Sequence, residues 1–168
     1  MHSRTTQVGT SADMLNYVDT GGHAQPVVFV HGNSSSIASF TYQLESSLAR
    51  THRVIAVDLP GHGKSPWASA EEREAYSLPY YARVLSAFAK ALGLERPVYV
   101  GHSLGGHVLL EASASLRASG LVLFGTPPFR RPPNFDEAVL ANPAAAIYAA
   151  AEASEAALRA VIAASFRP

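Results

Sequence analysis

The sequence predicts an α/β fold in which helices flank a mostly parallel β-sheet. Short, apolar, β-branched runs alternate along the 168 residues with longer segments of helical period, which is the pattern of repeated strand–helix units. The apolar runs are continuous, as expected of parallel strands that are buried on both faces. Hydrophobic residues make up 48% of the chain, enough for the core of one domain.

Four buried strands are predicted from these runs. They cover residues 27–30, 54–57, 98–100 and 121–124. Ahead of them, residues near 5–9 and 13–19 are expected to form an N-terminal hairpin, with Gly21 and Gly22 as the turn into the first buried strand.

Three helices are predicted between the strands. Apolar residues recur at helical spacing over residues 37–48 and again over residues 81–92. Ser77 is a suitable N-cap for the second helix, and Gly93 fits the position after its last turn. The third helix begins at the glycine-rich turn after the third strand and is expected to run to about residue 116.

The composition changes after Phe124. Residues 125–133 contain four prolines in nine positions, too many for a helix or a central strand. An alanine-rich segment of helical character follows it. We therefore expect a core over residues 1–125 and, over residues 126–168, a proline-rich excursion that leads into helices.

Charge and composition narrow the class of partner. Thirteen basic residues balance thirteen acidic ones without a basic cluster, which argues against a nucleic acid or an anionic membrane surface. Cysteine is absent, and the histidines lack carboxylate partners at metal-ligand spacing, so neither disulfides nor a metal or other cofactor is expected. The polar N-terminus and the lack of a long apolar run predict a cytoplasmic protein with a small-molecule ligand.

Three polar loops follow three of the predicted strands directly. Their sequences are HGNSSS at residues 31–36, DLPGHGKS at residues 58–65 and GHSLGG at residues 101–106. Loops at the carboxyl ends of parallel strands are where an open α/β sheet binds its ligand. The third loop has the GxSxG form of a nucleophile elbow, a sharp strand-to-helix turn that exposes a serine hydroxyl.

These loops supply the groups that acyl transfer requires. Ser103 is the candidate nucleophile, and the backbone N–H of Leu104, the next residue, is one candidate donor to the developing oxyanion. The second donor is expected from Asn33 in the first loop, whose side-chain amide is also a candidate contact for a polar substrate group. The loops thus predict acyl transfer through a serine nucleophile.

In these three motifs the chain resembles the α/β-hydrolase fold family, and the likeness extends over nearly its whole length. Together with GTPP at residues 125–128, the motifs are similar to those of the α/β-hydrolase N-acyl-homoserine lactonases. The resemblance implies two-step hydrolysis of an ester or a lactone in the complete enzyme, with N-acyl-homoserine lactone as a candidate substrate. It implies a helical cap after residue 126. It also implies a triad acid and a late histidine that follow the nucleophile on loops after later strands.

Neither triad partner is found in this sequence. After Ser103 the only histidine is His107, which lies on the same helix and is not expected to reach the hydroxyl, and His102 is expected to point to the opposite side of the turn. The resemblance implies that the last strands, with the acid and the histidine, are missing, so that 168 residues alone are inactive or nearly so. The alternative is a shortened pseudoenzyme that binds a small molecule without turnover.

The remaining polar residues of the loops are interpreted as structural. His31 is expected to hold its loop by hydrogen bonds, Asp58 to hold its glycine-rich turn, and His62 and Lys64 to lie on the surface. Four aromatic residues are candidates for an apolar acyl pocket, although core or cap packing is the commoner use of such side chains. They are Trp67, Phe129, Phe135 and Tyr148. The sequence does not indicate an oligomeric state.

Overall fold

The computed structural model describes residues 4–7, 14–68 and 75–127, together with the isolated positions 154, 156 and 159. The chain divides into two compact units, Met1–Thr126 and Pro127–Pro168. The sheet and the helices described below all belong to the first unit. Apart from positions 156 and 159, which are helical, the cap and the helices expected after residue 133 lie outside the described residues.

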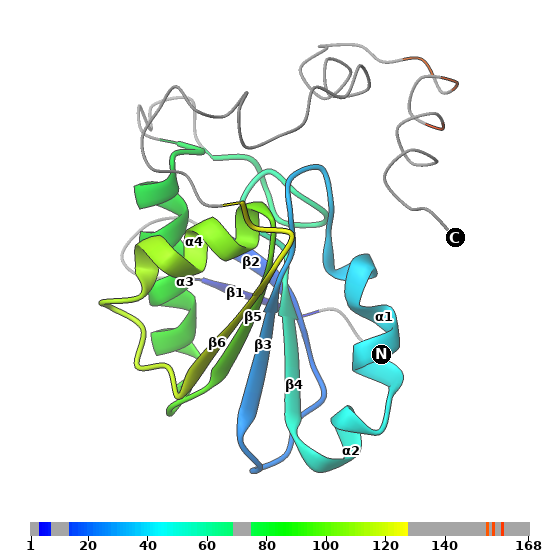
Figure 1. Ribbon diagram of the computed structural model, residues 1–168, viewed down its shortest axis with the longest axis vertical. Helices are drawn as coiled ribbons and strands as arrows, with labels where there is room; N and C mark the ends of the chain where they lie inside the picture. Colours follow the sequence, from blue (N-terminus) through cyan, green and yellow to red (C-terminus); the bar gives the residue numbers. More distant parts are fainter. Residues whose placement is uncertain are drawn as a thin grey trace. The chain divides into compact units, whose positions relative to one another are not determined.

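The first unit is built on a six-stranded sheet with the strand order β1-β2-β4-β3-β5-β6 (Figure 1). Its strands are β1 (Arg4–Gln7), β2 (Met14–Asp19), β3 (Pro26–Val30), β4 (Arg53–Val57), β5 (Val98–His102) and β6 (Gly120–Phe124). The last four are parallel, whereas β1 pairs antiparallel with β2, and β2 antiparallel with β4. The predicted α/β fold, the four parallel strands and the N-terminal hairpin are thus confirmed. The expected burial of the fourth of these strands is wrong, because residues 121–124 of β6 are exposed at the edge of the described sheet.

The register of the central strands brings their carboxyl ends to one edge of the sheet. Val30, the last residue of β3, lies opposite Val57 of β4 on one side and Gly101 of β5 on the other. The loops that follow these strands therefore begin side by side. This alignment places the three sequence motifs next to one another.

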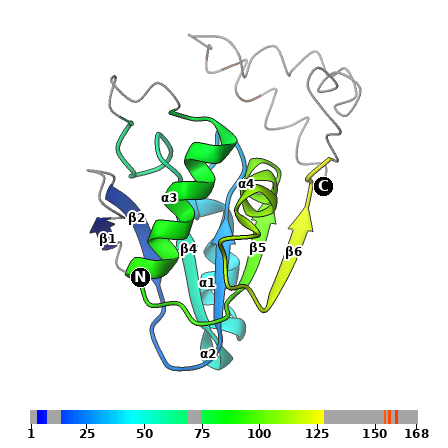
Figure 2. The same cartoon turned by 90° about the vertical axis from the view of Figure 1, so that its left-hand side faces the viewer.

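Helices cover both faces of the sheet (Figure 1). They are the 3₁₀-helix η1 (Ile37–Phe40) and the α-helices α1 (Thr41–Glu45), α2 (Leu48–Thr51), α3 (Leu78–Ala91) and α4 (Leu104–Ala112). Helices α3 and α4 bury apolar side chains against one face, and η1 and α1 bury Phe40 and Leu44 against the other. Figure 2 shows β1 and β6 at opposite edges of the resulting three-layer arrangement.

Helix α3 begins and ends as its sequence predicts. Ser77 is the N-cap, and its Oγ accepts a hydrogen bond of 3.3 Å from the backbone N–H of Tyr80. Pro79 lies in the first turn, where its missing N–H leaves no hydrogen bond unmade. After the helix, Gly93 has a φ of 59°, a conformation that glycine adopts without a steric cost.

The prediction of one continuous helix over residues 37–48 is wrong. Ser46 has extended backbone angles between α1 and α2, and its hydroxyl donates to Gln43 O and accepts from Leu48 N. A serine that bonds its own neighbours in this way offers the backbone an alternative to helical hydrogen bonds. Helix α4 is also shorter than predicted and ends at Ala112, before residue 116.

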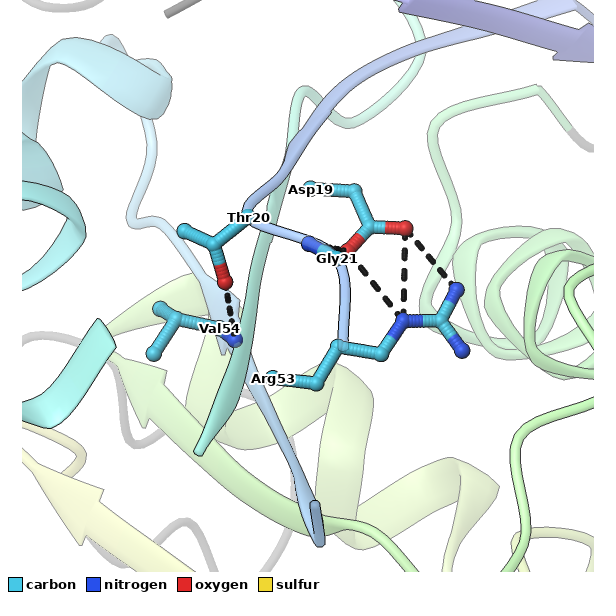
Figure 3. Close-up of polar contacts among 5 residues, drawn as sticks. All are labelled: Asp19, Thr20, Gly21, Arg53 and Val54. Atoms are coloured by element: carbon cyan, nitrogen blue, oxygen red, sulfur yellow. Dashed lines mark hydrogen bonds and ion pairs between the residues drawn. The ribbon is translucent and has the colours of Figure 1, made fainter. Parts of the chain in front are cut away.

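Polar contacts join β2 to the start of β4, at the end of the sheet away from the three motifs (Figure 3). Arg53 Nη2 lies 2.8 Å from Asp19 Oδ2, and Asp19 Oδ1 also accepts a hydrogen bond from the backbone N–H of Gly21. Beside this ion pair, Val54 N donates to Thr20 Oγ1. The carboxylate raises the pKa of the Arg53 guanidinium, chiefly through its hydrogen bond. These contacts fix the turn that leads from the hairpin into β3.

Candidate active site

Ser103 forms the whole connection between β5 and α4. Strand β5 ends at His102 and α4 begins at Leu104, so the chain turns from strand to helix at a single residue. Ser103 accordingly has a φ of 49° and a ψ of −114°, a conformation rarely adopted by residues other than glycine. Such a conformation costs roughly 1–3 kcal/mol and is concentrated at functional sites. This is the geometry of a nucleophile elbow.

Close packing around the turn requires the glycines that surround Ser103. A methyl group on Gly101 would lie 2.8 Å from the Cα of Gly106, and one on Gly105 would lie 2.6 Å from His31 O. Gly106 faces the side chain of Thr126, which leaves no room for a Cβ. Because real Cβ atoms do not approach backbone atoms so closely, larger residues here would push α4 away from β3 and β5.

The first loop lies directly against Ser103. A Cβ on Gly32 would be 3.2 Å from the Cβ of Ser103, so the two backbones meet at this point. Gly105, in the first turn of α4, packs on the carbonyl end of β3. The structure therefore brings the loop that carries Asn33 to the N-terminal end of α4, where Leu104 is the first helical residue. Sequence reasoning missed the role of Gly32, although a glycine between two polar loop residues is the signal for such a close approach.

Asn33 is exposed, and its side chain reaches across to the second loop. The distance between Asn33 Oδ1 and His62 Nε2 is 3.4 Å. His62 is half-buried, and its ring also packs against those of His31 and Tyr81, with centroid distances of 5.1 Å and 6.4 Å. The expectation that His62 is a surface residue of its turn is therefore confirmed in part, because the ring is partly accessible and partly packed. Lys64 is exposed, as expected.

His31 joins the first loop to the second. Its Nε2 accepts a hydrogen bond of 3.0 Å from the backbone N–H of Leu59, so in the neutral ring Nδ1 carries the proton and donates to Gly32 O at 2.7 Å. The pKa of His31 is lowered from its ordinary value of 6.5, chiefly because the ring is buried. A proton on Nε2 would break the bond to Leu59. His31 is thus a neutral, loop-holding residue, as the sequence suggested.

Asp58 holds the second loop together from within. Its side chain is 2% exposed and accepts hydrogen bonds from the backbone N–H groups of Ile37 and Lys64 and from Asn16 Nδ2, at 2.7–2.9 Å. Buried carboxylates of this kind are stabilised by several donors. Asp58 therefore has the structural role expected of it. The sequence carried no signal for Asn16, which lies on β2 and is 42 positions away.

Ser103 also contacts Phe124, the last residue of β6, and Thr126, which follows the strand. Thr126 Oγ1 lies 3.4 Å from Ser103 O, and the backbone N–H of Ser103 donates to Phe124 O at 3.1 Å. The ring of His102 stacks on that of Phe124 with a centroid distance of 4.9 Å, and burial lowers the pKa of His102. Burial likewise lowers the pKa of His107, whose backbone N–H bonds to Ser103 O. Within the described residues, no histidine or carboxylate is hydrogen-bonded to Ser103 Oγ.

Of the aromatic candidates for an acyl pocket, only Trp67 lies among the described residues. Its side chain is 78% exposed and makes an edge-to-face contact with Tyr76. In the described part of the chain, no group of three or more histidine or acidic side chains is arranged to hold a metal ion. No helix in that part is both long enough and apolar enough to cross a membrane.

Comparisons with known proteins agree with this geometry. The model of the alpha/beta hydrolase family matches residues 27–168. A 2-hydroxy-6-oxononadienedioate/2-hydroxy-6-oxononatrienedioate hydrolase from Cupriavidus pinatubonensis is 34% identical over 127 residues, which are 72% of this chain and 43% of the relative. The bifunctional epoxide hydrolase 2 of Sus scrofa is 31% identical over 133 residues, which are 77% of this chain and 23% of the relative.

Among solved structures, the N-acyl homoserine lactonase AidH is similar over almost all of the chain. Its serine-to-glycine variant, in complex with N-hexanoyl homoserine lactone, has a TM-score of 0.85 and 32% identity, and the match covers 97% of this chain and 59% of that one. The chain thus spans less than two thirds of the length of each of these relatives. With the family model matching most of its residues, the chain belongs to the alpha/beta hydrolase family.

Proposed function

We propose that this protein is a serine hydrolase in which Ser103 attacks the carbonyl carbon of an ester or a lactone. The observation that carries the proposal is the strained Ser103 at the N-cap of α4, held against Gly32 of the neighbouring loop. A helix N-terminus carries a partial positive charge and free N–H groups, which favour an anion at this position. The turn thus offers both a nucleophile and a site for the oxyanion.

In the proposed mechanism, the oxyanion is held by two backbone N–H groups. They are those of Leu104, at the start of α4, and of Asn33, in the adjacent loop. Each donor of this kind contributes about a hundredfold to a thousandfold to the rate of acyl transfer. Ser103 forms an acyl-enzyme as the C–O bond to the alcohol breaks. The alcohol leaves when the substrate is an open ester and stays attached to the acyl group when it is a lactone, and water then releases the acyl group. The general base and the triad acid belong to groups outside the described residues.

For the substrate, we propose an N-acyl homoserine lactone. The support is the likeness to AidH, which extends over 97% of this chain and includes complexes with N-hexanoyl homoserine lactone and N-butanoyl homoserine. The chain has no net formal charge, which suits a neutral ligand. Serine at the nucleophile position argues against epoxide hydrolysis, because the resemblance implies an aspartate nucleophile for that reaction.

The test is hydrolysis by the full-length protein of a panel that contains N-hexanoyl homoserine lactone and simple aryl esters. Ser103→Ala is expected to lower kcat by at least about a thousandfold, because the nucleophile is lost. Ser113→Ala is the matched control, since Ser113 is an exposed serine at the other end of α4. Turnover that survives Ser103→Ala would overturn the proposal.

A binding protein of the same fold is the second candidate. It is favoured by one observation: no base is hydrogen-bonded to Ser103 Oγ within the described residues. Calorimetry separates the two functions, because a binding protein would show saturable heat with N-hexanoyl homoserine lactone and leave the lactone ring intact. Ring opening in the same sample would exclude this second candidate. It is detected as a release of protons, because hydrolysis of the lactone produces a carboxylic acid.

A further inference from the structure

We infer that His62 is a positioning residue that holds the side-chain amide of Asn33 for contact with the amide group of an acylated substrate. The inference rests on the proposed function and deepens it. Its starting point is the contact of 3.4 Å between His62 Nε2 and Asn33 Oδ1, which joins the loops after β3 and β4. Through this contact, the glycine-rich loop after β4 supports the side chain of Asn33 in the loop beside the nucleophile.

The ring of His62 is itself held from several sides. Its Nδ1 lies 3.0 Å from Pro60 O, and its backbone N–H donates to Leu59 O at 3.0 Å. The ring also packs at tilted angles against the ring of His31, whose two nitrogens are both engaged with backbone groups, and against the ring of Tyr81 on α3. The ring is therefore placed by contacts that do not involve Asn33.

Asn33, in contrast, depends on His62 for its side-chain orientation. The residue is exposed, and within residues 4–7, 14–68 and 75–127 the ring of His62 is the polar partner found for its amide. An amide without this partner would rotate freely and would lose that freedom on binding a ligand, at a cost that a held amide avoids. His62 thus prepares Asn33 for its ligand.

The tautomer of His62 decides which half of the amide faces the ligand. With the proton on Nε2, the ring donates to Asn33 Oδ1, and the NH₂ group remains for a carbonyl oxygen of the substrate. With the proton on Nδ1, the ring donates to Pro60 O, and the rotated amide donates its NH₂ to Nε2 and presents Oδ1 to a substrate N–H. In both cases the complementary ligand is a secondary amide, which carries a carbonyl and an N–H.

The experiment compares two lactones in the full-length protein. N-hexanoyl homoserine lactone carries a secondary amide, and γ-butyrolactone has none. His62→Leu is expected to raise KM for the first about fivefold to tenfold and to leave kcat and the second substrate almost unchanged, because one binding hydrogen bond loses its preorganisation. His62→Gln, which keeps a polar group within reach of Asn33, is expected to restore most of the loss.

A double-mutant cycle tests whether His62 acts through Asn33. In an Asn33→Ala background, His62→Leu should cause no further change in KM. Equal losses on both lactones, an additive double variant, or a His62→Leu enzyme that matches the wild type would each overturn the inference. If His62→Leu does not fold, His62→Phe takes its place in both backgrounds, because phenylalanine keeps a ring against His31 and Tyr81 but has no polar group for Asn33.

An NMR measurement keeps the inference separate from the proposed function. If the wild type opens no lactone and hydrolyses no ester, the proposed function fails. The side-chain NH₂ resonances of Asn33 are still expected to move in His62→Leu, towards the positions of a freely rotating amide. Unchanged resonances would show that His62 does not hold Asn33, whatever the activity of the protein.

Discussion

At the scale of single residues, Ser103 shows how the fold stores strain at one position. Its φ of 49° is unfavourable for any residue with a side chain. The positions of β5 and α4 and the packed glycines around Ser103 nevertheless hold the backbone in this conformation. Natural proteins commonly give up stability at a functional residue in this way. The strain therefore predicts a measurable difference in stability between two variants that both lack the hydroxyl group of Ser103.

Ser103→Gly is expected to be more stable than Ser103→Ala by about 1 kcal/mol, because glycine adopts the required φ and ψ without a Cβ clash. The comparison removes the same hydroxyl from both proteins, so the loss of polar contacts cancels. Urea unfolding followed by circular dichroism provides the two free energies of unfolding. If Ser103→Ala is equally stable or more stable, the elbow is not strained.

His31 predicts how stability depends on pH. Burial lowers the pKa of His31 in the folded protein below 6.5, so the unfolded chain takes up a proton first as the pH falls. Stability is therefore complete above about pH 6.5 and decreases as the pH falls towards the folded-state pKa, by up to about 1.4 kcal/mol per pH unit for one such group. The lowered pKa values of His102 and His107 act in the same direction.

The measurement is the free energy of unfolding between about pH 7.5 and about pH 5.5. His31→Gln is expected to be less stable at the upper limit, because a loop-joining ring is lost, and to have a smaller slope across the range. The slope is the decisive quantity. A wild-type protein that becomes more stable towards acid, or an unchanged slope in His31→Gln, would contradict this account.

At the scale of elements, the close packing of α4 on β3 predicts how a larger residue at the contact changes the stability of the protein. A Cβ on Gly105 would meet the backbone carbonyls of Val30 and His31, which cannot move without displacing the strand. Gly105→Ala is therefore expected to cost about 3 kcal/mol or more of unfolding free energy, at the upper end for overpacked sites. Gly120→Ala is the matched control, because nothing lies within 4 Å of a Cβ at that position and its φ is not positive.

Differential scanning calorimetry compares the melting temperatures of Gly105→Ala and Gly120→Ala. The first should fall well below that of the wild type, whereas the second should remain near it or exceed it, since an added Cβ restricts the unfolded chain. The order of the two variants reflects the contact between α4 and β3. Equal melting temperatures would show that α4 has room to move.

The elements differ in how far the sequence alone predicts them. The parallel strands and α3 were predictable because their signals are local: continuous β-branched runs, and a serine cap with a following glycine. The break at Ser46 was not, because the same apolar spacing fits one helix or two short ones. The contacts of Asp58 with Asn16, and of His62 with Asn33, join segments far apart in the sequence, and only the sheet order brings those segments together.

At the scale of the whole molecule, β6 is an exposed and apolar edge of the sheet. Its side chains Leu121, Val122, Leu123 and Phe124 are 36%, 50%, 36% and 47% exposed, and only β5 pairs with this strand among the described strands. An edge with unpaired backbone groups and apolar side chains is a template for pairing with another strand. It has no charged residue of its own to prevent such pairing.

The polypeptide of residues 1–168 is therefore expected to self-associate through β6. Sedimentation velocity at rising concentration should show species larger than the monomer, and Val122→Lys should shift them towards the monomer, because a charge on an edge strand opposes pairing. Leu110→Lys is the matched control. Leu110 is 48% exposed but lies on the helix α4, whose backbone groups are not available to pair with a strand. If both lysine variants dissociate the assembly equally, general hydrophobic attraction and not the edge of β6 drives the association. A wild-type chain that stays monomeric at all concentrations would contradict the prediction altogether.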